Sequence, residues 1–115
     1  MPKNKAIVVS TFMSHDAIER KIYIIRGKKV MFDKDLASLY EVQTRNLNKA
    51  VTRNLERFPE DFMFQLNPRE FKNLMFQFGT SSWGGTRKRP RVFTDYGILM
   101  LSSVLNSRRA AQVNI

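Results

Sequence analysis

The sequence of 115 residues contains no cysteine and only one histidine, His15. Without cysteine the chain can form neither a disulfide nor a cysteine-ligated zinc site, a composition that fits a reducing cytosol. His15 has no second histidine or cysteine with which to share a metal ion, which argues against a catalytic zinc or a histidine-based triad. No apolar run approaches the roughly 20 residues that a membrane-spanning helix needs. We therefore expect a soluble, cytoplasmic protein without a membrane partner.

Glycine is also scarce, with five residues in the chain, and no glycine-rich nucleotide-binding motif is present. The glycines between residues 79 and 85 are not followed by Lys-Ser or Lys-Thr, nor spaced as in a dinucleotide-binding turn. The paired carboxylates at 33–35 and 60–61 fall where helix starts and turns need side-chain acceptors, so capping accounts for them. We predict that the protein is not an enzyme and uses no cofactor and no small-molecule substrate.

Acidic residues are outnumbered two to one, because 20 Lys and Arg stand against ten Asp and Glu and leave a net charge of +10. Such an excess favours a polyanionic partner, either nucleic acid or an acidic membrane surface, and charge alone does not choose between them. With 43% hydrophobic residues the chain can bury a modest core. This length predicts one domain.

Residues 33–57 combine an apolar seam with a basic face, a pattern that predicts a helix-turn-helix. Asp33 or the following turn can cap the first helix, whose apolar positions recur at helical spacing: Leu36, Ala37, Leu39 and Tyr40. Glu41-Val42 breaks this run. Thr44 is the expected N-cap of a second helix that continues to about Arg57.

The second helix of this pair separates apolar from basic side chains. At roughly 100° per residue, the apolar positions of one flank are Leu47, Val51, Leu55 and Phe58. The basic positions, four apart along another flank, are Arg45, Lys49, Arg53 and Arg57. One flank can pack while the other meets phosphate. The alternative is an ordinary helical hairpin with a solvated charged face.

The remaining segments predict short strands, a helical turn and three further helices. Residues 22–32 favour a β-hairpin that turns at Arg26-Gly27-Lys28, where Gly27 can adopt positive φ. Residues 62–66 alternate as a strand, with Phe62, Phe64 and Leu66 on one face. Asn67-Pro68 begins a helix, and Thr94 caps a very apolar helix over 95–105. Residues 1–13 form either a short strand or a tail. Ser14 or Asp16 caps a helical turn over 15–21, and Ser107 caps a last helix.

A basic loop precedes Thr94, in which Arg87, Lys88, Arg89 and Arg91 crowd around Pro90. We predict a wing that reaches a phosphate backbone or a minor groove, on the same side of the domain as the basic flank of 44–57. The alternative is a solvated loop without a ligand. Trp83 in this loop can stack on a base, but anchoring on the core is the favoured interpretation, since indoles are mostly buried.

Four segments resemble a known family: DKDLASLYEV, RNLERFPEDFMFQL, RVFTDYGILMLSSVLNS and RRAAQVNI. In this order and spacing they are similar to the "ORF six N" domain, found at the N-terminus of phage antirepressor-type proteins and kin to KilA-N and Bro-N. The resemblance covers about residues 20–115. It implies a small α+β DNA-binding module of bacterial or phage origin, usually followed by a separate C-terminal region that we expect to be missing here. Family members often carry glycine where this chain has Glu41.

We therefore predict one α+β domain over 20–115, preceded by a tail and helical turn over 1–19, that binds double-stranded DNA in transcription regulation. The expected DNA-binding residues are Thr44, Arg45, Asn46, Asn48, Lys49, Arg53, Arg57, Arg87, Lys88, Arg89 and Arg91. Asn46 and Asn48 are expected to read bases. The alternative is a protein-interaction or dimerisation module that uses the 95–105 helix, and a homodimer is compatible with both. RNA ranks third, because the aromatic residues follow core periodicity.

Overall fold

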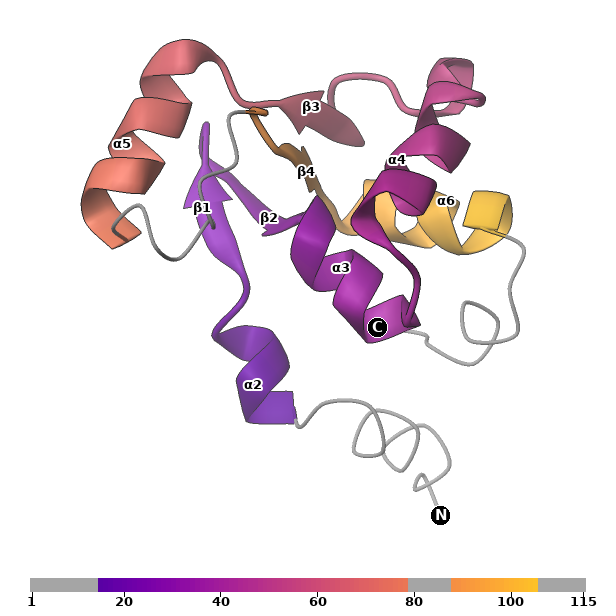
Figure 1. The fold of residues 1–115 in the computed structure, drawn as a ribbon, viewed down its shortest axis with the longest axis horizontal. Coiled ribbons are helices and arrows are strands. Elements are labelled where there is room, and N and C mark those ends of the chain that lie inside the picture. Colours follow the sequence, from indigo (N-terminus) through magenta and orange to yellow (C-terminus); the bar gives the residue numbers. More distant parts are fainter. Residues whose placement is uncertain (1–14, 79–87, 106–115) are drawn as a thin grey trace.

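A four-stranded antiparallel sheet runs through the middle of the domain in the computed structural model (Figure 1). The structure describes residues 15–78 and 88–105. Its elements in chain order are α2 (His15–Glu19), β1 (Tyr23–Ile25), β2 (Lys28–Phe32), α3 (Asp33–Tyr40), α4 (Thr44–Thr52), a 3-10 turn (Leu55–Arg57), β3 (Met63–Gln65), α5 (Pro68–Phe78), β4 (Arg91–Phe93) and α6 (Asp95–Leu105). The predicted α+β class is confirmed. Expectations for residues 1–13, Trp83, Arg87 and the helix after Ser107 lie outside the described residues.

The strands follow the order β1-β2-β4-β3, so β4 joins two segments that are distant in sequence. Met31 and Met63 both pair with Phe93 across this sheet, which places the three side chains on one face. They pack there with Leu36 of α3 and Leu101 of α6 in one buried cluster, to which α4 also contributes. The helix pair and α6 therefore cover this face.

The opposite face of the sheet is covered by α5. Phe32 and Phe64 pair with Val92, one residue out of phase with the first set, and belong to a second buried cluster with Leu66 and Leu74. Since successive strand residues point to opposite faces, strands buried on both sides must be apolar at every position. This explains why β2 and β4 end in the continuous runs Val-Met-Phe and Val-Phe.

The prediction that Phe62, Phe64 and Leu66 share one strand face was wrong for Phe62. Phe64 and Leu66 share the second cluster, but Phe62 precedes β3 and packs against the first cluster instead. Its carbonyl accepts a 3.0 Å hydrogen bond from the backbone N–H of Thr94, and its ring stacks on Tyr96 with centroids 5.5 Å apart. Attachment to the start of α6 therefore turns Phe62 away from the strand alternation.

Outside the helix pair, the hairpin turn and two helix caps form where the sequence predicts them. The hairpin closes with Arg26 and Gly27 both at positive φ, 56° and 74°, as a two-residue type I′ turn requires. Asn67 and Glu70 form a reciprocal capping box at the start of α5: each side chain accepts a 2.8 Å hydrogen bond from the other's backbone N–H. The Thr94 hydroxyl accepts the N–H of Gly97 at 3.4 Å and so caps α6.

The helix pair forms, with two corrections. Thr44 is the first residue of α4, and the N-cap is Gln43 in extended conformation without a side-chain capping bond. The helix ends at Thr52, well before Arg57. Asn54 explains this early end, because its side-chain amide donates a 2.8 Å hydrogen bond to the carbonyl of Ala50. The Asn54 backbone N–H then bonds to Val51, one residue short of the α-helical partner.

Glu41 ends α3 in the left-handed conformation, with φ 57° and ψ 44°. The next N–H, from Val42, reaches the carbonyl of Ala37 at 2.9 Å, which is the hydrogen bond of a Schellman motif. This position favours glycine, because a Cβ costs about 1 kcal/mol there. We expect Glu41→Gly to raise the free energy of unfolding by about 1 kcal/mol, measured by urea denaturation. An unchanged or lower midpoint would show that the Glu41 side chain compensates for the backbone strain.

Candidate nucleic-acid interface

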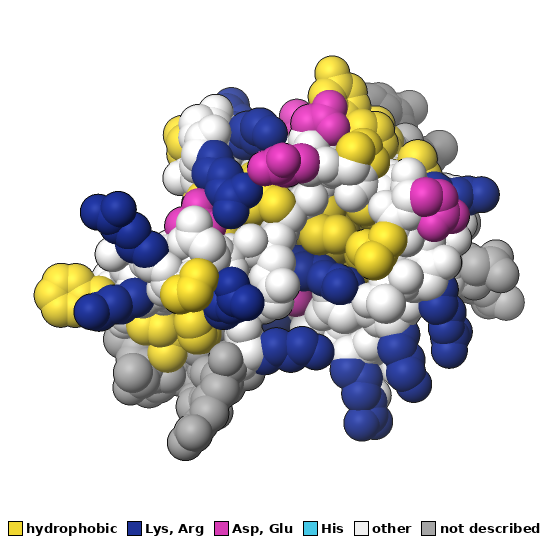
Figure 2. Space-filling model, turned by 90° about the horizontal axis from the view of Figure 1, so that it is seen from above, with side chains coloured by type: hydrophobic (Ala, Val, Ile, Leu, Met, Phe, Trp, Pro, Cys, Tyr) yellow, Lys and Arg dark blue, Asp and Glu magenta, His cyan; other side chains and the backbone are white. Residues whose placement is uncertain are grey.

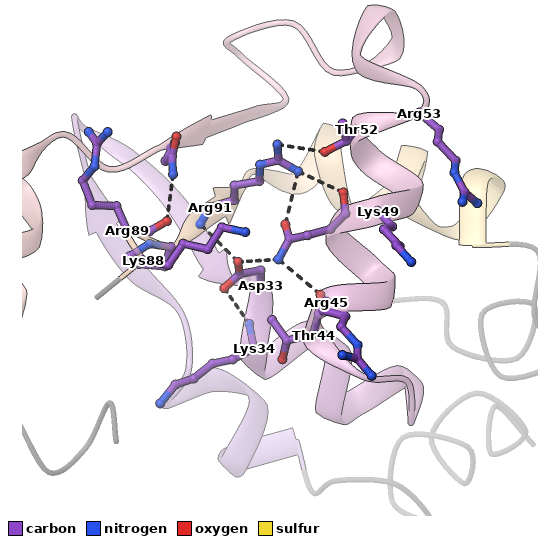
Figure 3. A pocket seen from close by; sticks show the side chains of 13 residues that line it. Asp33, Lys34, Thr44, Arg45, Lys49, Thr52, Arg53, Lys88, Arg89 and Arg91 are labelled. Carbon is purple, nitrogen blue, oxygen red and sulfur yellow. Dashed lines mark hydrogen bonds between the residues drawn. The ribbon is translucent and has the colours of Figure 1, made fainter. Parts of the chain in front are cut away.

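An open groove of about 870 Å³ lies between α4 and the segment 88–91 that leads into β4 (Figure 3). Its lining residues are Asp33, Lys34, Thr44, Arg45, Asn48, Lys49, Thr52, Arg53, Gln65, Lys88, Arg89, Pro90 and Arg91. Seven of these are Lys or Arg, and Asp33 is the one acid among them. The structure therefore brings the predicted basic flank and the predicted wing together on one groove.

The α4 rim of the groove is formed by Arg45, Lys49 and Arg53, which are exposed and extend away from the core (Figure 3). Leu47 and Val51 on the opposite side of α4 are fully buried and fix its rotation. Figure 2 shows Lys and Arg side chains projecting from several sides of the molecule, among them a row at the lower right, below the horizontal position of α4 in Figure 1, while the Asp and Glu side chains in view lie mostly in the upper half. The amphipathic sequence of α4 thus turns its cations outward.

The second rim is formed by Lys88 and Arg89, both exposed. The backbone of this segment is tied to the end of β3: the Leu66 N–H donates to the Pro90 carbonyl at 3.0 Å, and the Gln65 amide donates to the Arg89 carbonyl at 3.0 Å. Arg89 Nη1 also donates to the carbonyl of Leu66 at 3.2 Å. These bonds hold the segment as an extension of the sheet, so the rim has a defined position.

Arg91 lies on the floor between the two rims and points toward α4. Its guanidinium donates to the Asn48 carbonyl at 3.1 Å, to Asn48 Oδ1 at 3.3 Å and to the Thr52 hydroxyl at 3.1 Å. Burial lowers the pKa of Arg91, and the carboxylate of Asp33 opposes this shift. The side chain remains a cation, but most of its donors are engaged within the domain.

Asp33 is the residue that sequence reasoning underrated. Asp33 is the first residue of α3 and not its predicted N-cap, which is Phe32 without a side-chain capping bond. The Asp33 carboxylate, 6% exposed, accepts the backbone N–H of Lys34 at 2.8 Å. It also accepts the Asn48 amide at 2.9 Å and the backbone N–H of Arg91 at 3.3 Å. One carboxylate therefore joins α3, α4 and β4. The paired acids at 33–35 were the available signal, but capping was a sufficient explanation for them.

Two predicted DNA-binding residues, Asn46 and Arg57, do not line the groove. Asn46 is exposed on α4 next to the groove but does not line it. Arg57 is exposed on the 3-10 turn that follows the early end of α4, so it does not continue the row of cations. Arg87 lies outside the described residues. The other eight, namely Thr44, Arg45, Asn48, Lys49, Arg53, Lys88, Arg89 and Arg91, all line the groove.

Within residues 15–78 and 88–105, no group of three His, Cys, Asp or Glu side chains is placed to hold a metal ion. In the same part of the chain, no helix is long and apolar enough to cross a membrane.

These features define a small α+β domain in which a helix pair and a sheet extension border a cationic groove. The chain belongs to the ORF6N domain family, whose model matches residues 20–104 and thus most of the sequence. The resemblance found in the sequence is thereby confirmed. ORF6N is a phage-type regulatory domain and not a known catalytic family. No curated protein and no solved structure matches this chain.

Proposed function

We propose that this protein is the DNA-binding domain of a phage-type antirepressor or transcriptional regulator, and that it binds duplex DNA in the cationic groove. The observation that supports this proposal is the composition of the groove. Lys and Arg side chains from two segments some 40 residues apart border it, and its one acidic residue, Asp33, is buried. Phosphate contacts by Lys and Arg supply most of the affinity of a protein for DNA. A basic helix face that is only solvated would not require a second basic segment on the opposite side of a groove.

Duplex DNA fits the groove better than single-stranded nucleic acid. Proteins that bind single strands stack bases on aromatic side chains. None of the described residues that line the groove is aromatic. A helix with an outward cationic face, bordered by a second basic segment, instead suits a duplex whose major groove receives the helix and whose backbone meets the rims.

The exposed residues suggest a division of roles. Arg45, Asn46 and Lys49 near the start of α4 would face base edges, and Arg53 would contact the backbone, with Arg57 beyond it. Lys88 and Arg89, with Arg87 before them, would meet the backbone or the adjacent groove. Amide and guanidinium groups read adenine and guanine respectively, so Asn46 and Arg45 are the expected determinants of sequence preference.

The salt dependence of binding tests this proposal. Anisotropy titrations with a mixed-sequence duplex between about 50 and 200 mM salt should give a linear log K against log[salt], because phosphate contacts release counterions. Arg53→Gln and Lys88→Gln should each lower the slope by about 0.9, the value of one lost phosphate contact.

Lys72→Gln is the matched control, because Lys72 is an exposed lysine of α5, on the other face of the sheet. It should leave the slope within about 0.3 of the original. If all three variants behave alike, the groove has no special role and the binding is a diffuse effect of net charge. If the unmodified protein does not bind any duplex, the proposal fails.

The alternative function, a protein-interaction or homodimerisation module, would use α6. Tyr96 and Leu99 on this helix are 61% and 58% exposed, so α6 presents apolar side chains to solvent. Sedimentation velocity over a hundredfold range of protein concentration separates the two functions. A mass that stays monomeric without DNA and rises with DNA favours the groove, whereas self-association without DNA favours α6.

A further inference from the structure

We infer that Asn48 is a positioning residue of the DNA site and not a base-reading one: with Asp33 and Arg91 it fixes the two cationic rims at one separation. This inference rests on the proposed function and deepens it. It also replaces the expectation that Asn46 and Asn48 act alike. The side chains of Asp33, Asn48 and Arg91 form a hydrogen-bonded cluster, the floor network.

The amide of Asn48 has no donor left for a base. Nδ2 carries two hydrogens, and it donates to Asp33 Oδ2 at 2.9 Å and to the carbonyl of Thr44 at 3.2 Å. Oδ1 accepts from Arg91 Nη1 at 3.3 Å. The orientation of the amide is fixed by its partners, since a carboxylate only accepts and a guanidinium only donates. Reading adenine requires a donor and an acceptor together, so Asn48 would have to break this network first.

The floor network connects the elements that carry the two rims (Figure 3). Asn48 belongs to α4, whose exposed cations form one rim, and Arg91 directly follows the segment that carries Lys88 and Arg89. Asp33 bonds to both, through the Asn48 amide and the Arg91 backbone N–H. Arg91 adds a bond to Thr52, one turn further along α4. Relative movement of the rims therefore requires breaking several partly buried hydrogen bonds.

Asn46 provides the contrast on the same helix. It is exposed, and its side chain has no hydrogen-bond partner within the part of the chain that the structure describes. It lies beside Arg53 and Lys49 on the outward side of α4, since residues three and seven apart fall close together on a helix. Asn46 can therefore offer both the oxygen and the NH2 of its amide to a base without breaking a hydrogen bond inside the domain.

Preorganisation explains why this arrangement matters for binding. A protein that must order its contact residues when it meets a ligand loses affinity, because each side chain that becomes fixed loses conformational freedom. The floor network sets the spacing of the rims before DNA arrives. Removing the Asn48 amide changes no charge, so a loss of affinity that leaves the preferred sequence unchanged would come from the geometry of the rims.

The decisive experiment compares Asn48→Leu with Asn46→Leu. Each variant is first shown to be folded at the binding temperature by circular dichroism, and each is then used in a selection from random duplex oligonucleotides. Asn48→Leu should weaken binding to preferred and other duplexes alike, by about tenfold, and keep the same preferred sequence. Asn46→Leu should change the preferred sequence. A changed preference in the folded Asn48→Leu variant, or affinity within twofold of the original protein, would overturn the inference.

A distance measurement separates positioning from simple loss of stability. Because the chain has no cysteine, Lys49→Cys and Lys88→Cys can be introduced and spin-labelled cleanly, one on each rim. Without DNA, electron spin resonance should give one narrow distance between the labels, unchanged by Asn46→Leu and broadened by Asn48→Leu. A narrow distance in the folded Asn48→Leu protein would refute the role of the network. This result does not depend on DNA binding, so it can fail or succeed independently of the proposed function.

Discussion

Gly97→Ala is expected to destabilise the domain by about 3 kcal/mol, a large part of the stability of a protein of this size. A Cβ on Gly97 would lie on the carbonyl oxygen of Phe62 and 2.9 Å from the carbonyl carbon. Both atoms belong to the backbone, and that carbonyl already accepts the N–H of Thr94. Neither partner can rotate away as a flexible side chain would, so α6 would have to shift off the sheet. Urea denaturation of the two proteins measures the difference.

Gly27→Ala is a suitable control for this change, because it separates conformation from space. Gly27 has φ +74°, but a Cβ there would have no neighbour within 4 Å. Its substitution should cost only about 1 kcal/mol, the strain of a left-handed residue. Equal losses of unfolding free energy from the two substitutions would show that α6 can move away from Phe62 easily. The close packing of α6 against Phe62 would then contribute little to stability.

The second large effect is expected for Asp33→Ala, which should also lower the free energy of unfolding by about 3 kcal/mol. The substitution removes a buried acceptor and leaves the Asn48 amide and the backbone N–H groups of Lys34 and Arg91 without it. Hydrogen bonds to a charged group contribute about 1.5–3 kcal/mol, and buried donors that lose a partner add a desolvation cost.

Asp61→Ala is the matched control for Asp33→Ala, since Asp61 is exposed. Its loss should change the free energy of unfolding by less than about 0.5 kcal/mol. Urea midpoints at neutral pH provide the comparison. If Asp33→Ala changed the free energy of unfolding as little as Asp61→Ala, water would have to replace the carboxylate as hydrogen-bond acceptor. The floor network would then not be a rigid element.

Local features of this fold follow from the sequence because their causes lie within a few residues. The turn at Gly27 depends on the positive φ of two adjacent residues. The capping box at Asn67 and the Thr94 cap each join a side chain and a backbone group that are three residues apart. Two amphipathic helices with a break at Glu41 were predictable for the same reason. The family resemblance added the fold class, which local patterns alone do not determine.

The basic residues of the groove could be predicted from the sequence, but the hydrogen bonds that hold its two rims together could not. The basic residues near 45 and 89 could be named, since charge is visible in the sequence. That Asn48 and Arg91 face inward could not, because their partners lie up to 58 residues away, across β4. The end of α4 was missed as well, since it depends on which of two donors of Asn54 reaches the Ala50 carbonyl.

The hydrogen bond between Asp33 and Arg91 spans 58 positions, and this has a practical meaning for protein engineering. A peptide of residues 33–52, or a graft of that helix pair onto a foreign scaffold, would transfer Arg45 and Lys49 without the strand that holds the second rim opposite them. Such a chimera should attract polyanions but show little discrimination among them. The smallest transplantable unit is therefore the sheet together with its helices.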